Sequence, residues 1–531
     1  MAVEHSSDLQ RADALHHDRQ YHAAIAAYRS AVAGDASLYE AWYGLGCASL
    51  SLKAYADAAA ALRRAMALQP GADRTRCNLA EVLFQLGDVD GAVAEYLRAA
   101  DSRDPEVRAV ALSCIACIAP GASRQDNFTI LAARQRWIDW ESRGLRRVTA
   151  AAPEAGRKLR VGYLGAFYGA RNWMKMYMGV LNAHDRDRFE CHFLSDGATP
   201  SADCGYVDQA EDRIWEITGV SNADLAQHIV DARLDVLVDL NGYSFQRRLP
   251  LFLYRPARLQ ICWNGMYGTS GLPDIDWLVG DASVIPPEEE RYYREPIVRV
   301  PGSYLAFSVF YPVPDVAPPP CLSAGHLTFG CFASAYKLTD QTIAAYAGIL
   351  RDAPTSRLLL RNRTLEEASN RAALLGRFAR LGIAEDRLTL EGGAEHFEFL
   401  RGYDRVDVAL DAFPYNGGTT TAEALWQGVP MLTCNGDRWA GRTSRSLLAA
   451  GGLDEWVAAD VAGFRNAAVA LAHAADTPGR LAALRGGMRE HLRTSAVCDV
   501  VGLCRSLEAL YTRDTASAAG AGEVGTRQRR G

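Results

Sequence analysis

The segment 406–430, VDVALDAFPYNGGTTTAEALWQGVP, carries the most chemical information in the sequence. A buried strand is predicted at its start, and Gly417 and Gly418 in the following loop allow the backbone to approach a ligand closely. Thr419 and Thr420 stand where the next helix should begin and can cap it. Because the first turn of a helix offers free N–H groups at its positive end, this loop predicts a diphosphate site. A tight turn with a capped helix is the purely structural alternative.

Two charged residues can complete such a site. Glu423 lies one turn into the predicted helix, where its carboxylate can accept hydrogen bonds from ribose hydroxyls. Lys337, in FGCFASAYKLTD, follows a predicted strand at the entrance to the same domain and can neutralise a phosphate. An isolated lysine is more often a solvated charge at a helix end, so Lys337 alone does not define the site.

Other candidate residues lie outside this segment. Asp235 and Asp239, in LDVLVDLNGYS, fall on the same face of one predicted strand. Carboxylates at the carboxyl end of a strand in an open sheet are candidate site residues, although Asp239 can equally cap the following turn. His396 is a single histidine, a kind of residue that is more often structural or solvated.

Metal and common cofactor sites are not indicated by the sequence. The eleven histidines form no H-x-x-x-H pair, and no D-x-D triplet directly follows a predicted strand. The glycines at 162, 165 and 169 do not match G-x-G-x-x-G, and a Walker lysine pattern is missing. The single C-x-x-C, formed by Cys114 and Cys117, lies in an apolar helical run, which favours two buried structural thiols.

The composition is that of a globular protein. Of 531 residues, 49% are hydrophobic and 23% charged, with a formal net charge of −6, which argues against general disorder and against a basic coat for nucleic acid. Apolar stretches such as 109–120 are shorter than the ~20 residues that span a bilayer. The Met1 end has neither the basic nor the apolar region of an export signal, so we expect a cytoplasmic protein.

The elements before these sites form a repeat. An offset of 34 residues superimposes three units of the tetratricopeptide pattern, in which small residues allow two helices to pack closely. A generic alanine-rich amphipathic helix is the alternative. Stacked repeats of this kind form a concave groove that usually binds a peptide or another protein. The clearest unit contains Trp42, Leu45, Gly46, Ala58, Leu62, Ala65 and Pro70.

The apolar pattern divides the chain into five segments. Residues 1–105 contain the three repeats, and 106–157 form a helical bridge and linker. Apolar runs alternate with helical stretches in 158–320 and again in 321–512, which predicts two parallel α/β lobes with a ligand cleft between them. The predicted strands of the first lobe lie at 159–165, 189–195, 234–242 and 259–265. Residues 513–531 are rich in Gly, Ala and polar residues and are predicted to be disordered. The predicted fold class is an α-solenoid followed by two Rossmann-like α/β lobes.

The order of these motifs resembles a known family. Tetratricopeptide repeats followed by LRVGYLG, VDLNGYS, WNGMYGTSG, YKLT and FPYNGGTTTAEALWQGVP are similar to the O-GlcNAc transferase/SPINDLY glycosyltransferases, in their bacterial branch. The resemblance extends to about residue 510. It implies a GT-B fold with an acceptor-side first lobe and a nucleotide-sugar-binding second lobe. It also implies inverting, metal-independent transfer of a sugar, foremost GlcNAc from UDP-GlcNAc, to Ser or Thr of a polypeptide held by the repeat groove.

The resemblance also implies a role for each matching residue. Lys337 matches the lysine that binds the donor diphosphate, where its charge would stabilise the leaving group. Thr419 and Thr420 match threonines at a helix start that contact the same diphosphate. Glu423 occupies the acidic position that holds the ribose. His396, in HFEFLRGYDRVDVALD, lies in a stretch similar to one near the nucleotide in bacterial members.

Three positions differ from the animal members of the family. Arg171 and Gly418 stand where those enzymes have histidines, and Ser334 replaces a residue with an amide side chain. These positions lie near the sugar and the acceptor, so transfer of fucose or a flagellin-type sugar, or an inactive repeat scaffold, are alternatives. The catalytic base is also open. Asp235 is the candidate, because the guanidinium of Arg171 stays protonated.

Overall fold

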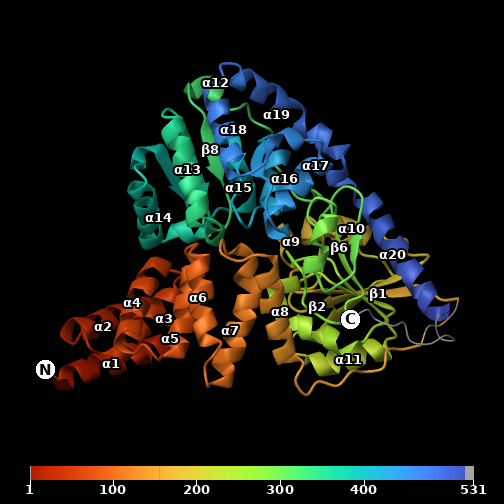
Figure 1. The fold of residues 1–531 in the computed structure, drawn as a ribbon, viewed down its shortest axis with the longest axis horizontal. Helices are drawn as coiled ribbons and strands as arrows, with labels where there is room; N and C mark the ends of the chain where they lie inside the picture. The colour runs from red at the N-terminus through yellow and green to blue at the C-terminus, as the bar shows by residue number, and fades with distance from the viewer. Residues whose placement is uncertain (1, 153, 155, 521–531) are drawn as a thin grey trace.

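The computed structural model describes residues 2–152, 154 and 156–520. Figure 1 shows a helical module at the N-terminus, a first α/β lobe at the lower right and a second α/β lobe at the top. This architecture confirms the predicted fold class. Among the described helices, none combines the length and the apolar character needed to cross a membrane.

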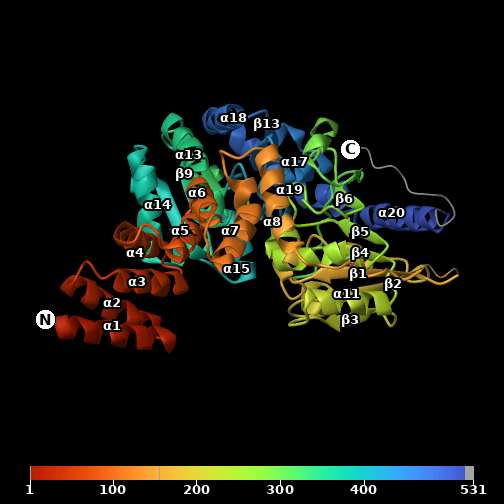
Figure 2. The same ribbon diagram turned by 60° about the horizontal axis from the view of Figure 1, so that its bottom comes forward.

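The N-terminal module consists of antiparallel helix pairs. Three of its small residues, Ala24, Ala58 and Ala92, recur at intervals of 34 and have no exposed surface, so each allows the two helices of its pair to pack closely. The helices are α1 (Ala2–His17), α2 (Tyr21–Gly34), α3 (Tyr39–Ser51), α4 (Tyr55–Leu68), α5 (Asp73–Gln85), α6 (Val89–Ala99), α7 (Pro105–Ile118) and α8 (Asn127–Glu141). The last two form the predicted helical bridge, and α8 runs along the boundary of the two lobes in Figure 2.

A buried arginine fixes the bridge to the first lobe. The guanidinium of Arg134, on α8, has no exposed surface and donates hydrogen bonds to the carbonyl oxygens of Ala116 (3.1 Å), Met266 (2.7 Å) and Thr269. It also lies 3.8 Å from the centre of the Tyr243 ring. Because a buried charge is tolerated only when it is fully hydrogen-bonded, this contact specifies how α8 sits on the lobe.

The first lobe is a parallel sheet with strand order β3-β2-β1-β4-β5-β6-β7. Its strands are β1 (Leu159–Gly165), β2 (Phe189–Ser195), β3 (Arg213–Glu216), β4 (Val236–Asp239), β5 (Leu259–Cys262), β6 (Trp277–Gly280) and β7 (Ile297–Arg299), and its helices are α9 (Arg171–Met174), α10 (Met178–Asn182) and α11 (Asn222–Asp231). The sequence predicted β1, β2, β4 and β5 but not the strands at the two sides of the sheet.

The second lobe repeats this topology with the order β10-β9-β8-β11-β12-β13, also parallel. Its strands are β8 (Thr328–Cys331), β9 (Arg357–Arg361), β10 (Leu388–Glu391), β11 (Val408–Leu410), β12 (Met431–Cys434) and β13 (Val457–Ala458). Its helices are α12 (Cys321–Ala324), α13 (Asp340–Asp352), α14 (Ala368–Arg380), α15 (His396–Arg401), α16 (Thr419–Trp426), α17 (Thr443–Ala450), α18 (Val461–His473) and α19 (Thr477–Arg493). In both sheets the strand order reverses beside the first strand, which is where open α/β sheets bind ligands.

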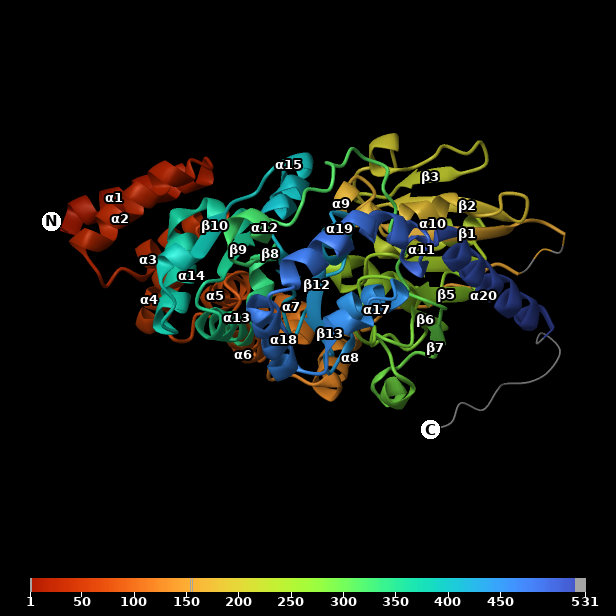
Figure 3. The ribbon, with the colours of Figure 1, turned by 90° about the horizontal axis from the view of Figure 1, so that it is seen from above.

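The last helix, α20 (Val500–Gly520), leaves the second lobe and packs on the first (Figures 1 and 3). Its Glu508 accepts a hydrogen bond from Nδ1 of His184, at 3.0 Å, and the hydroxyls of Tyr511 and Tyr163 lie 3.2 Å apart. Two predictions are therefore corrected. The helix packs on the first lobe, although its residues 500–512 were predicted to belong to the second lobe. It also continues through 513–520, where disorder was predicted, while 521–531 lie outside the described residues.

The repeats pack directly against the second lobe. The ring of Phe84, near the end of α5, stacks on Tyr336 with a centroid distance of 4.8 Å. Gly87 has a φ of +83°, and a Cβ there would lie 2.5 Å from the carbonyl oxygen of Leu338, so the turn requires glycine. One repeat earlier, the Asn370 side chain donates to the carbonyl of Lys53 at 2.9 Å. The repeat module and the second lobe thus share an interface at the residue preceding Lys337.

Candidate functional site

The candidate site lies where the two central strands of the second sheet end. Strands β8 and β11 are parallel neighbours, so the loops that follow them meet at one edge. Lys337 is in the first loop, and Gly417 to Thr420 are in the second. The hydroxyls of Thr339 and Thr342, beside Lys337, both donate to the carbonyl of Phe413 at 2.8 Å. This cross-link fixes the two loops relative to each other.

A buried carboxylate organises the second loop. Asp411 directly follows β11 and is 3% exposed. One of its oxygens accepts hydrogen bonds from the backbone N–H groups of Ala412 (3.0 Å) and Gly417 (2.8 Å), and the other accepts from the Thr433 hydroxyl at 2.7 Å. A Cβ on Gly417 would lie 2.5 Å from the hydroxyl oxygen of Thr421, so glycine is required for this close return of the backbone.

The helix after this loop begins without a capping side chain. Thr419 and Thr420 are the first residues of α16, and Gly418 occupies the capping position. This corrects the expectation that the threonines cap the helix. Because Gly418 has no side chain, it cannot bond to the N–H groups of the first turn, and these groups with the two threonine hydroxyls stand at the positive end of the helix. This arrangement suits an anion.

Lys337 provides a cation next to that helix end. It ends a short 3-10 turn, Ala335–Lys337, and its Nζ donates to the carbonyl oxygen of Asn416 at 2.7 Å, one residue before Gly417. The Nζ also lies 4.2 Å from the centre of the Tyr415 ring. Burial lowers the pKa of Lys337 to about 8, and the nearby charge of Asp411 opposes this shift. The ammonium therefore lies at the loop before α16, where the sequence predicted a positive charge for a phosphate.

Glu423 and His396 come together one turn into α16. Glu423 is 3% exposed, and its carboxylate lies 3.5 Å from Nε2 of His396, which is on α15. Lys175, from the first lobe, forms an ion pair with the same carboxylate. Burial raises the pKa of Glu423, and Lys175 opposes this shift. The structure thus places both predicted nucleoside-binding residues together.

The first lobe supplies the facing wall. Its Tyr267 contacts Tyr415 of the second lobe, with ring centres 4.9 Å apart. Arg171 lies on α9, where its Nε donates to the carbonyl oxygen of Asp203 at 3.1 Å, and its charge helps to lower the pKa of His396. Ser334 is exposed just before the turn that carries Lys337. Arg171, in the first lobe, therefore acts electrostatically on His396 of the second lobe.

Asp235 is not part of this site, which corrects its selection as the candidate base. It precedes β4 and so lies at the amino end of the sheet, opposite the cleft. Its carboxylate accepts hydrogen bonds from the Arg157 guanidinium (2.7 and 3.0 Å) and from the Arg160 backbone N–H (2.9 Å). Asp239 lies at the carboxyl end of β4, on the side of the cleft. Its carboxylate accepts hydrogen bonds from the N–H groups of Asn241 and Gly242, so it caps the following turn.

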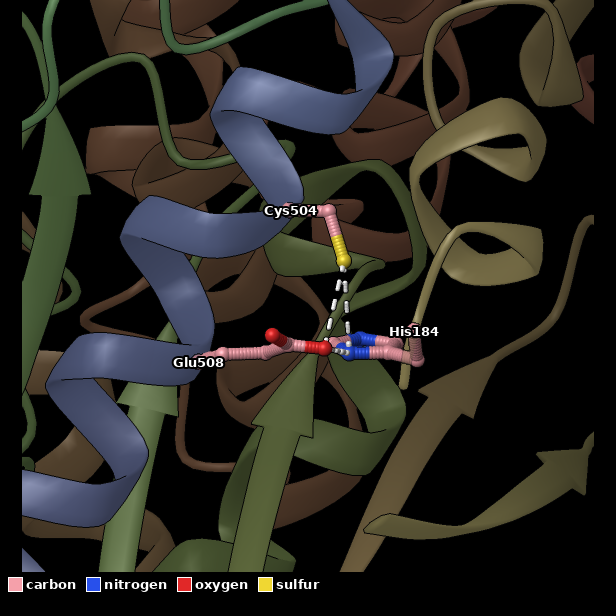
Figure 4. A group of neighbouring side chains, drawn as sticks. All are labelled: His184, Cys504 and Glu508. Carbon is pink, nitrogen blue, oxygen red and sulfur yellow. Dashed lines mark hydrogen bonds and ion pairs between the residues drawn. The ribbon is translucent and has the colours of Figure 1, made fainter. Parts of the chain in front are cut away.

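One group of side chains among the described residues could hold a metal ion: His184, Cys504 and Glu508 (Figure 4). The three are buried where α20 meets the first lobe. Glu508 also accepts hydrogen bonds from the Asp185 backbone N–H at 2.9 Å and from Arg505 at 2.5 Å. The pKa of Glu508 is held near 2: burial raises it, and hydrogen bonds from His184, Asp185 and Arg505 more than offset that. The cluster is explained as a hydrogen-bonded anchor for α20.

Sequence reasoning missed Asp411, Tyr415 and Lys175. The first was detectable, because a carboxylate directly after a strand is a common site signal. Lys175 also had a signal in the composition: only four of the 57 Lys and Arg residues are lysines, and two of the four lie at this site. The ring contact of Tyr415 with Tyr267 spans the two lobes and left no local pattern.

The geometry agrees with sequence comparisons. A model of glycosyl transferase family 41 matches residues 146–308 and 321–507, and a tetratricopeptide repeat model matches 49–112. The probable UDP-N-acetylglucosamine–peptide N-acetylglucosaminyltransferase SPINDLY of Solanum lycopersicum is 30% identical over 360 residues, which cover 67% of this chain and 38% of the tomato protein. The corresponding SEC protein of Arabidopsis thaliana is 28% identical over 67% of this chain and 37% of its own length. The chain thus spans about two fifths of these relatives.

A solved structure matches nearly the whole chain. A point variant of Thermobaculum terrenum O-GlcNAc transferase superimposes with a TM-score of 0.82 at 29% sequence identity. The match covers 98% of this chain and 99% of that one, so it includes the repeats as well as both lobes.

Proposed function

Because this chain belongs to glycosyl transferase family 41, we propose that it is a protein O-glycosyltransferase, which transfers a sugar from a nucleotide donor to a Ser or Thr hydroxyl. The observation that carries this proposal is the pairing of the Lys337 ammonium with the uncapped start of α16 at the carboxyl end of neighbouring strands. A nucleoside diphosphate is the anion that fits such a site best, since a carboxylate for the ribose lies one turn further along the helix.

In the proposed reaction, the acceptor oxygen bonds to the anomeric carbon as the bond from that carbon to the diphosphate breaks. The nucleoside diphosphate leaves with the electron pair of that bond, and the proton of the acceptor hydroxyl is released to solvent. Lys337 and the helix start stabilise the charge that develops on the leaving diphosphate, and Thr419 and Thr420 orient it. Glu423 and His396 hold the nucleoside.

The proposed donor is UDP-GlcNAc, as the names of the matched relatives suggest. A second candidate is another sugar nucleotide, favoured by the guanidinium of Arg171 at the acceptor-side wall and by the lack of a side chain at Gly418. The two candidates share the diphosphate site and differ at the sugar. The repeat groove is the proposed binding surface for the acceptor polypeptide, because the repeats pack on the same loop that carries Lys337.

A binding screen tests the proposal. Calorimetric titrations with UDP-GlcNAc, UDP-glucose, GDP-fucose and a CMP-nonulosonic acid, with and without EDTA, should show binding of at least one donor. We expect UDP-GlcNAc to bind equally well in both conditions. Binding of GDP-fucose instead would select the second candidate. If the folded protein binds none of the four, the transferase proposal is wrong and the repeats act alone as a scaffold.

We predict that activity falls as the pH rises through about 8. The lowered pKa of Lys337 means that its ammonium is present below this pH and lost above it in the free enzyme. A bound diphosphate favours the charged form, so kcat should decline at a higher pH than kcat/KM. Steady-state rates between pH 6.5 and 10 check this. The Lys337→Arg variant, whose side chain stays charged, should lack this decline, and a flat parent profile would contradict the prediction.

A further inference from the structure

Lys175 is unusual for its burial and for its residue type. It follows α9 of the first lobe and has no exposed surface. Elsewhere this chain uses arginine almost exclusively, including at the buried position of Arg134. The other two lysines outside the site, Lys53 and Lys158, lie at the surface. At this buried position the chain therefore has a lysine ammonium in place of the arginine guanidinium that it uses almost everywhere else.

The ion pair and the hydrogen-bond contact of this ammonium are both with the second lobe. Its Nζ bonds to the Glu423 carboxylate on α16 and lies 3.1 Å from Nε2 of His396 on α15. It also lies 4.7 Å from the centre of the Tyr311 ring, in the segment that joins the lobes. Because a buried ammonium needs acceptors for its protons, this position is satisfied only when the two lobes are together.

The same contact determines the protonation of His396. An ammonium can only donate, so Nε2 of His396 must accept, and the single ring proton resides on Nδ1. Burial, with the charges of Lys175 and Arg171, lowers the pKa of His396 to about 4. The imidazole is therefore neutral at physiological pH and offers Nδ1–H as a donor.

We propose that Lys175 is a positioning residue for the nucleoside end of the donor: it reaches from the acceptor-side lobe to hold the Glu423 carboxylate and the Nε2 edge of His396. This inference rests on the proposed function. It adds that donor binding depends on a residue of the opposite lobe, acting through two residues of the donor lobe. Lysine and arginine are not interchangeable at this buried position, because an ammonium is a compact point charge and a guanidinium is a planar fork.

The charge of Glu423 gives the test a clear signature. The groups that face or act on this carboxylate are Lys175, His396, Tyr311 and Tyr403, with Arg171 beside Lys175. Lys175 is the group among them that lowers the pKa of Glu423 against the effect of burial. When Lys175 is removed, nothing in this group opposes the effect of burial, so the pKa of Glu423 should rise further and more of the carboxyl should be protonated at a given pH than in the parent.

The experiment is titration of the full-length protein with UDP by calorimetry between pH 6 and 9. We expect Lys175→Met to bind UDP at least about tenfold more weakly than the parent at pH 7, since a charge-assisted hydrogen bond is lost, and this deficit relative to the parent to shrink as the pH rises. Lys158→Met is the matched control, because Lys158 pairs with Glu211 away from the cleft, and should bind UDP as the parent does. Unchanged affinity of Lys175→Met at every pH would overturn the inference.

A double variant separates positioning from general damage. In a Glu423→Gln background, Lys175→Met should weaken UDP binding by well below tenfold and should cause no pH dependence from residue 423, because the ion pair has already been broken and only the contact with His396 remains to be lost. A large additional loss would overturn the inference, and this comparison holds even if Lys175→Met alone does not fold. If the parent protein binds no nucleotide, the proposed function fails. If the parent binds but the variants behave additively, only the role of Lys175 fails.

Discussion

Replacing Lys337 by methionine should reduce sugar transfer by at least about 10³-fold while the protein stays folded. The Nζ of Lys337 lies at the loop that precedes α16, where a leaving diphosphate would develop its charge. Loss of one preorganised donor in such a position typically costs ~10²–10³ in kcat, and here a full positive charge is lost as well. Methionine keeps the chain length, and it removes a partly buried charge whose lowered pKa shows that the charged form is already disfavoured.

Released nucleotide measures the turnover of this variant, and thermal melting measures its folding. Lys53→Met is the matched control, since Lys53 is exposed in a repeat turn and should retain parental turnover. Weak residual binding of UDP is expected, because the helix start and Glu423 remain. Turnover within tenfold of the parent would show that Lys337 does not act on the reacting diphosphate.

Replacing Asp411 by alanine should both destabilise the protein, by about 3 kcal/mol, and weaken UDP binding by at least tenfold. The buried carboxylate accepts bonds from Ala412, Gly417 and Thr433, and alanine leaves these donors without a partner. The bond to Gly417 ties the end of β11 to the residue two places before α16. Without it, the loop is no longer held in the form that presents the helix start.

A second buried carboxylate on the same strand provides the control. Asp407 precedes β11, has no exposed surface, and accepts bonds from the N–H groups of Cys321 (2.9 Å) and Thr328 (2.8 Å). Asp407→Ala should cost a similar stability but leave UDP affinity unchanged, because Asp407 lies at the opposite end of the sheet. Chemical denaturation and calorimetry measure the two effects. Equal UDP affinities for both variants would contradict the assigned role of Asp411.

The sequence predicted those parts of the fold that have a strong local pattern. The strands Leu159–Gly165 and Phe189–Ser195 have the predicted bounds, because each is an apolar run buried on both faces. Strand β3, with the sequence RIWE, was missed because it is short and largely exposed at the edge of its sheet. The polar composition after 512 hid the continuation of α20, whose preceding turns are anchored by Glu508 and Tyr511.

The site was predictable where it depends on loops that follow neighbouring strands. Lys337, Thr419 and Thr420 each come just after a recognisable strand, so topology brings them together. Asp235 was chosen from its face of the strand, but residues 235 and 239 are ~13 Å apart along it, and only one can lie at the cleft. The contact of Lys175 with Glu423 joins residues 248 positions apart, beyond any periodic pattern.

The stacking of Phe84 on Tyr336 bears on how this chain can be recombined. When repeats from another protein are grafted onto the lobes, a junction placed between the repeats and the lobes removes the Phe84 side of the loop that carries Lys337. The turn at Lys53 and the turn ending at Gly87 are both seated on the second lobe. A chimera that keeps residues 53–87 and exchanges only the residues before them retains these contacts with the second lobe. The last repeats therefore belong structurally with the lobes, and only the repeats before them can be exchanged independently.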